Sequence, residues 1–139
     1  MTAMTQGQKE AFLAGVHVGV LSIAREDQGP LAAPIWYGYV PGGDVWVMIG
    51  RNSRKAGLLA LGTPVSLCAQ RETSPYAYVT VEGPVVRIEE GTDQHIRELA
   101  TRYLGSDEGS AYADNMPSGS RLTVTVRPET WLAVDYSRA

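Results

Sequence analysis

The sequence is poor in residues that build cross-links and metal sites, with one cysteine and two histidines in 139 residues. A single cysteine, Cys68, excludes a disulfide framework within the chain, and its strand-like surroundings favour a small core residue over a nucleophile. His17 and His95 lie far apart in the sequence, which disfavours a metal site. No signal-peptide pattern or membrane-length apolar run is present, so we expect a cytoplasmic protein.

Familiar catalytic motifs are also missing. The sequence has no HExxH, CxxC, GxSxG or phosphate-loop pattern, and no glycine-rich dinucleotide fingerprint follows a strand. His17 is expected in a strand with an ordinary partner, and His95 on a solvated helix face. Because no acid–base pair stands out, an enzyme of this kind is expected to borrow its reactive group from a cofactor.

The composition is that of an ordinary globular chain. Hydrophobic residues make up 44% and charged residues 19%, which allows a real core, and no linker or repeat divides residues 1–139, so we expect a single domain. The formal net charge of −3 argues against a general nucleic-acid binder.

Alternating apolar and polar residues predict about six strands joined mostly by hairpins. The strand signals cover residues 16–24, 31–40, 45–49, 65–70, 76–89 and 121–136, the last of them interrupted by a turn. Helical patterns cover residues 5–14, 56–61 and 92–104, and residues 109–116 predict a helical turn or a mobile segment. Together these patterns predict an antiparallel barrel with appended helices.

Basic residues gather at one strand-to-helix junction. Arg51, Arg54 and Lys55 follow the third predicted strand, together with Ser53. A helix N-terminus carries unpaired N–H groups and a positive dipole end, so cations are unfavourable there unless an anion binds. Ser53 is expected to cap the helix and to donate to that anion. The local sequence leaves open an ordinary solvated turn.

The most aromatic run, PIWYGY, begins at Pro34. Proline inside a strand predicts an edge, a bulge or a break in the hydrogen-bond ladder. Aromatic strand residues are most often core, which is the favoured interpretation. A break beside Ile35, Trp36 and Tyr37 would instead expose backbone groups next to large side chains, an arrangement that suits a flat ring.

The order of these patterns resembles the pyridoxamine 5′-phosphate oxidase-like superfamily of flavin- and deazaflavin-binding proteins. The resemblance is carried by VGVLSIA, PIWYGY, GRNSRKAGLL and YVTVEGPV, between residues 16 and 89. It implies a mainly β fold, a split antiparallel β-barrel of about six strands of Greek-key type with a few short helices. It also implies a homodimer that holds its cofactor at the subunit interface, with no nucleic-acid or membrane partner.

The resemblance further implies FMN as the cofactor or, alternatively, the deazaflavin coenzyme F-420. It places the phosphate at the basic turn and the ring beside the PIWYGY strand. The implied cofactor-binding residues are Pro34, Ile35, Trp36, Tyr37, Arg51, Ser53, Arg54, Lys55 and Gln70. An aromatic residue of the other subunit, namely Tyr76, Tyr78 or Trp131, is a further candidate, and the anionic tail of F-420 would favour Arg25, Arg71 or Arg87.

The function implied is an oxidoreductase that transfers hydride to or from a small organic substrate. The alternative is a flavin carrier or sensor without turnover, and a less favoured one is a barrel that binds haem through His17 or His95. The tail, YSRA, has no counterpart of the oxidase's substrate-phosphate residues, which argues against vitamin B6 oxidation.

Overall fold

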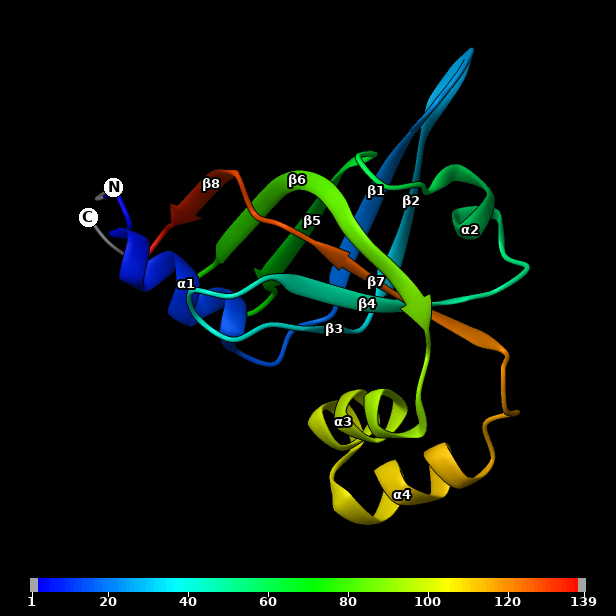
Figure 1. Cartoon of the computed structure of the whole chain (residues 1–139). Helices are drawn as coiled ribbons and strands as arrows, with labels where there is room; N and C mark the ends of the chain where they lie inside the picture. The colour runs from blue at the N-terminus through cyan, green and yellow to red at the C-terminus, as the bar shows by residue number, and fades with distance from the viewer. Residues whose placement is uncertain (1–2, 138–139) are drawn as a thin grey trace.

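The computed structural model describes residues 3–137, which form one curled antiparallel sheet and four short helices (Figure 1). The strand order is β2-β1-β5-β6-β7-β4-β3, and β8 pairs with β6 outside this path. In chain order the elements are α1 (Gln6–Ala14), β1 (Gly19–Arg25), β2 (Gln28–Ile35), β3 (Tyr37–Gly38), β4 (Val45–Gly50), α2 (Arg54–Leu58), β5 (Pro64–Arg71), β6 (Ala77–Glu90), α3 (Asp93–Leu104), α4 (Ser106–Asp114), β7 (Arg121–Val126) and β8 (Thr130–Asp135). The predicted fold class, mainly β and antiparallel with short helices, is confirmed.

Strand β6 is shared by the two halves of the barrel. Its first half pairs with β5 and β8, and its second half, from Val85, pairs with β7. Gly83 lies at the bend between the halves, where a Cβ atom would approach the Arg127 carbonyl oxygen to 1.7 Å. Only glycine fits at so close a backbone approach, so this residue allows the curvature seen in Figure 1.

Strict alternation along the strands builds the core. In β4, Val45, Val47 and Ile49 are at most 2% exposed, whereas Trp46 and Met48 face the other side of the sheet. Burying side chains of this size stabilises the fold by about 1.5–3 kcal/mol each. Trp46 and Met48 therefore lie on the outer face of β4, outside the barrel core.

Helices α3 and α4 form a hairpin beside one end of the barrel (Figure 1). Thr92 caps the first turn of α3, and Gly105, at a φ of 85°, joins the two helices. Left-handed backbone at this point favours glycine. The segment predicted over residues 109–116 as a helical turn or a mobile stretch thus lies largely in a regular helix, α4.

Several local predictions differ from the structure. The strand expected over residues 31–40 is interrupted at Trp36, which raises the number of described strands to eight. His17 precedes β1 rather than lying in it; its ring stacks on Phe12 at 4.4 Å, and burial lowers its pKa. Cys68 is half-buried, because it faces away from the core between buried Leu67 and Ala69.

Within residues 3–137 no helix is both long and apolar enough to cross a membrane.

Candidate functional site

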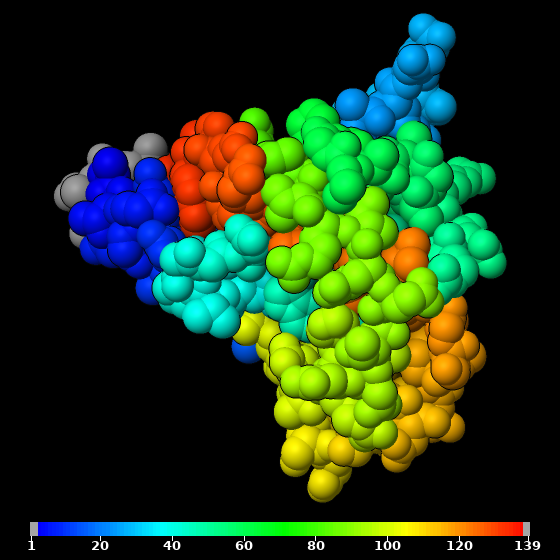
Figure 2. Space-filling view, viewed as in Figure 1, coloured from blue at the N-terminus to red at the C-terminus, as the bar shows by residue number. Residues whose placement is uncertain are grey.

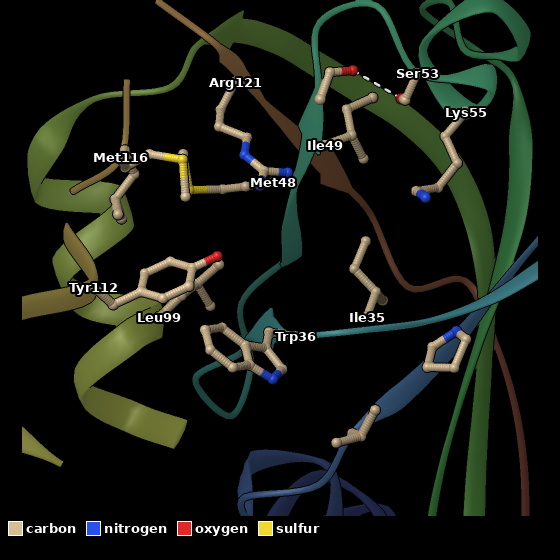
Figure 3. Close-up of a pocket in the computed structure, with 14 residues that line it drawn as sticks. Ile35, Trp36, Met48, Ile49, Ser53, Lys55, Leu99, Tyr112, Met116 and Arg121 are labelled. Atoms are coloured by element: carbon tan, nitrogen blue, oxygen red, sulfur yellow. Dashed lines mark hydrogen bonds between the residues drawn. The ribbon is translucent and has the colours of Figure 1, made fainter. Parts of the chain in front are cut away.

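A cavity of about 420 Å³ lies where the sheet fails to close. Strands β2 and β3 are the two ends of the strand order and follow each other directly through Trp36, yet they do not pair. The cavity opens at this gap, between the barrel and the α3–α4 hairpin (Figure 3). Its volume falls in the range of roughly 300–1,000 Å³ that small-molecule sites occupy.

One wall of the cavity is aromatic and apolar. Trp36 lies parallel to Tyr103, with ring centroids 5.0 Å apart and planes at 6°, and it meets Tyr112 of α4 at 5.4 Å. Leu99 of α3 and Met116, which follows the end of α4, line the same side (Figure 3). The wall is thus built from elements that are distant in sequence and presents a flat ring face.

The PIWYGY strand contributes unequally to this cavity. Pro34, Ile35 and Trp36 line it. Tyr37 instead points into the core, where its side chain is fully buried and its hydroxyl donates to the Leu13 carbonyl at 2.7 Å. Burial raises the pKa of Tyr37, so its phenol stays neutral. Alternation of side chains about the strand explains why Tyr37 and Trp36 face different surroundings.

Two cations that have no side-chain partner in the described part of the chain line the cavity. Lys55 of α2 and Arg121 of β7 make no hydrogen bond or ion pair through their side chains within residues 3–137. Arg121 pairs with Gly50 in the β4–β7 ladder, which brings it beside the basic turn. Both side chains point toward the centre of the cavity in Figure 3. Charges of this kind, without a counterion, favour an anionic ligand.

The other basic residues of the turn point elsewhere. Arg51 forms an ion pair with Glu90 and donates through Nε to the Gly119 carbonyl at 2.9 Å. The hydrogen bond that the Arg51 guanidinium donates to the Glu90 carboxylate lowers the pKa of Glu90. Arg54 is exposed, has no partner in the described part of the chain and does not line the cavity. The cations that are adjacent in sequence therefore do not form one cluster in space.

Ser53 shapes the turn. Its Oγ accepts from the Ala56 N–H at 3.3 Å, which confirms the expected cap, and it donates to the Gly50 carbonyl at 2.7 Å. The single hydroxyl proton is thus engaged within the protein, although Ser53 lines the cavity. Helix α2 begins at Arg54 and spans five residues, earlier and shorter than the pattern over residues 56–61 predicts.

Gln70 lies away from the cavity. It is exposed on β5, where it pairs with Tyr78, and its side-chain amide is 3.5 Å from Glu72. The arginines considered for an anionic tail are also elsewhere. Arg25 donates to the Gly29 carbonyl and Arg71 to the Pro75 carbonyl, and neither lines the cavity.

A second hollow of about 330 Å³ lies on the other side of α3 and includes Arg87. Here His95 bonds to Thr123 at 3.0 Å through Nδ1 and meets Trp46 at 5.4 Å. The prediction of a solvated His95 is therefore wrong, because the face of α3 that carries His95 packs against β4 and β7 and leaves its side chain 27% exposed. Neither His17 nor His95 lines the 420 Å³ cavity, and the described residues contain no group of three or more metal-ligating side chains.

Sequence reasoning missed every lining residue that comes from the second half of the chain. Arg121 has no local signal that separates it from any charged residue at a strand start. Its place follows from the pairing of β4 with β7, which is a long-range feature. The remaining missed lining residues are Val18, Met48, Ile49, Gly50, Ile96, Leu99, Tyr112 and Met116.

The fold is that of a split-barrel protein, and its cavity is lined by Lys55 and Arg121 as well as by Trp36. The chain belongs to the family described as pyridoxamine 5′-phosphate oxidase, which it matches over residues 5–135. No curated protein matches the sequence.

Solved structures share this fold at low sequence identity. An F-420 reductase is 23% identical, with a TM-score of 0.72 over 88% of this chain and 94% of that one. A conserved hypothetical protein from Mycobacterium tuberculosis is 22% identical, with a TM-score of 0.73 over 96% and 86%. An FAD- and haem-binding protein from Mycobacterium smegmatis is 16% identical, with a TM-score of 0.65 over 96% and 72%. Identities this low establish the fold alone.

Proposed function

We propose that the protein binds a planar redox cofactor with an anionic tail, FMN or the deazaflavin F-420, and acts as an oxidoreductase on a small organic substrate. One observation carries the proposal. Lys55 and Arg121, both without partners among the described residues, line the same cavity as the flat face of Trp36. A phosphate and an aromatic ring on one molecule match these two features. Membership of the family and the fold shared with an F-420 reductase support it.

The energetics require both ends of the cavity. Charge-assisted hydrogen bonds to Lys55 and Arg121 are worth about 1.5–3 kcal/mol each. Micromolar affinity needs a net binding free energy of roughly 8 kcal/mol, which is what remains after the entropic cost of association has been subtracted. Covering about 300 Å² of ring against Pro34, Ile35 and Trp36 adds about 7 kcal/mol gross at ~25 cal/mol/Å². Neither the cations nor the wall suffices alone.

The cofactor would supply the hydride chemistry, while this chain's residues bind and orient it. Lys55 and Arg121 would hold the anionic end. Trp36 would supply a flat surface for the ring, and Pro34 and Ile35 would contribute apolar contacts beside it. Leu99, Met116 and Tyr112 cover the remaining side and exclude water, which strengthens every electrostatic contact inside.

A second copy of the chain is the proposed partner. The outer face of the sheet carries an uncharged row, Val20, Cys68, Thr80 and Leu132, which the register aligns across β1, β5, β6 and β8. Val20 is 37% and Leu132 58% exposed. Because the cavity reaches this region through Val18, which is 52% exposed, a second copy on this face would also cover the cofactor.

Light scattering on the purified protein tests the partner. The wild type is expected as a dimer, and Leu132→Glu as a monomer with weaker cofactor binding, because the carboxylate would be buried without a partner. A wild-type monomer at micromolar concentration would exclude the second copy from the proposed function.

The cofactor is tested by what the protein binds. The protein is purified from a host that lacks F-420, and the bound ligand is read by absorbance and mass spectrometry. Bound FMN identifies the flavin, whereas an empty site that added F-420 fills identifies the deazaflavin; failure of both to bind refutes the proposal. Rapid-mixing reduction with candidate substrates then separates an oxidoreductase from a carrier, in which the bound ring would keep its redox state.

A further inference from the structure

The β1–β2 ladder stops one residue pair short of the aromatic wall. The two strands pair antiparallel from Leu21 with Ala33 to Gly19 with Ile35. Continuing the same register would pair Val18 with Trp36 and then His17 with Tyr37. Neither pair belongs to the ladder, because β1 begins at Gly19 and β2 ends at Ile35.

The hydroxyl of Tyr103, from the last turn of α3, lies between the backbones at this point. It accepts the Tyr37 N–H at 3.1 Å and lies 2.6 Å from the His17 carbonyl, to which it donates. In an antiparallel ladder, every second residue pair exchanges two hydrogen bonds between its N–H and C=O groups. Here a phenol, which is both donor and acceptor, satisfies one group of each residue instead. The oxygen thus replaces a direct contact between the two strands.

The separation of the strands shapes the cavity. Val18 and Trp36, the first pair that a continued ladder would form, both line it. The ring of Tyr103 stacks parallel to Trp36 at 5.0 Å, so the same side chain that parts the strands also sets the plane of the wall. Tyr103 itself is not among the lining residues, so it acts through Trp36 and the backbone.

We propose that Tyr103 is a positioning residue: its hydroxyl holds β1 and β2 apart at Val18 and Trp36, and its ring fixes Trp36 as the face on which the cofactor lies. The part that concerns the cofactor rests on the proposed function above. The part that concerns the backbone does not, because it is a property of the protein without ligand.

Tyr103→Phe removes one oxygen and keeps the ring. Without the hydroxyl, the Tyr37 N–H and the His17 carbonyl lose their shared partner and the strands are expected to close toward each other. In the protein without cofactor, we expect the Tyr37 amide and the Trp36 indole N–H to shift in NMR spectra and the hydrogen exchange of Tyr37 to change. Affinity for FMN or F-420 is expected to fall at least tenfold.

Tyr39→Phe is the matched control. Tyr39 is a buried tyrosine whose hydroxyl accepts the Gly42 N–H at 3.4 Å, and it does not line the cavity. This variant is expected to bind cofactor as the wild type does and to leave the Tyr37 and Trp36 signals in place. An equal loss of cofactor affinity in both variants would show that removing any buried tyrosine hydroxyl has this effect, and it would contradict a positioning role specific to Tyr103.

The outcomes separate the two proposals. Unchanged Tyr37 and Trp36 signals in Tyr103→Phe would overturn the inference, whether or not any cofactor binds. If the wild type binds neither FMN nor F-420 while those signals shift, the backbone role stands and the proposed function falls. Should Tyr103→Phe fail to fold, the wild type still decides: a nuclear Overhauser contact between the ring protons next to the Tyr103 hydroxyl and the Tyr37 amide is required, and its absence excludes the bridge.

Discussion

Lys55 and Arg51 belong to the same basic turn, but the protein uses their charges differently. Arg51 points outward, where Glu90 and the Gly119 carbonyl occupy its guanidinium. Lys55 points inward, has no partner among residues 3–137 and lines the cavity. The difference shows that like charges adjacent in a sequence need not form one binding site, because the fold determines which of the side chains point into the same cavity.

The inward half of the turn gains its second cation from another strand. Arg121 joins Lys55 because β7 pairs with β4 and places Arg121 opposite Gly50. The same pairing puts Ser120 beside the outward half, where its carbonyl accepts the Arg51 N–H at 2.9 Å. One strand therefore completes the site on the inside and fixes the turn on the outside. Figure 2 shows the surface at this end, where green atoms of the turn region lie beside orange atoms of β7 and the yellow-green atoms of β6 cover most of β4.

The largest effect is expected from removing both inward cations. Lys55→Ala with Arg121→Ala deletes two charge-assisted hydrogen bonds of about 1.5–3 kcal/mol each, so the affinity for FMN or F-420 should fall about a hundredfold or more. Fluorescence titration at fixed ionic strength measures it. The melting temperature of the protein without cofactor should change little, because neither side chain has a partner within the described residues.

The outward pair supplies the control with the same change in net charge. Arg51→Ala with Arg54→Ala also removes two positive charges, and its affinity is expected to stay within about threefold of the wild type, since exposed charges at a distance are screened. Similar losses in the two double variants would mean that general electrostatic attraction, rather than direction, binds the ligand.

A smaller effect is expected at the aromatic wall. Trp36→Leu removes the flat face that Tyr103 and Tyr112 support, and truncating an anchoring tryptophan commonly weakens binding by about 2 kcal/mol, or roughly thirtyfold. Trp46→Leu is the control, because Trp46 lies across α3 in the other hollow. The same titration should find the Trp46 variant within about threefold of the wild type. If the two variants lose equal affinity, the wall at Trp36 has no special role.

The fold could be predicted from sequence because its signals are local. Alternation marks the strands, Ser53 caps its helix as expected, and the proline at position 34 predicts the interruption that the structure shows at Trp36. These features depend on neighbouring residues and on one face being buried. The order of the strands across the sheet is a long-range feature, and the resemblance to a known family implied only a split antiparallel barrel of Greek-key type.

The candidate site was predicted only in part, for the same reason. Pro34, Ile35, Trp36, Ser53 and Lys55 line the cavity, whereas Tyr37, Arg51, Arg54 and Gln70 do not. Cofactor binding by any of these residues stays a prediction. Side-chain direction changes from one residue to the next in a strand or turn, and a shift of one position separates core from cavity. Contributions from α3, α4 and β7 depend on packing that no local pattern encodes.

The smallest effect is expected at the outward ion pair and concerns Glu90. Its hydrogen bond with Arg51 lowers the pKa of Glu90 in the folded protein. Stability from this pair is therefore present above the pKa of the unfolded chain and is lost as the pH falls through the folded value. Because both groups are exposed, its contribution to the free energy of unfolding is expected to be slight.

Arg51→Ala should raise the pKa of Glu90 toward its ordinary value and leave cofactor affinity unchanged. An NMR titration of the Glu90 carboxyl carbon, with and without the substitution, measures the first effect, and the fluorescence titration measures the second. A Glu90 pKa that does not move, together with a loss of affinity, would show that Arg51 serves the ligand rather than Glu90. The two halves of the turn would then form one cationic site, and the distinction between inward and outward charges would fail.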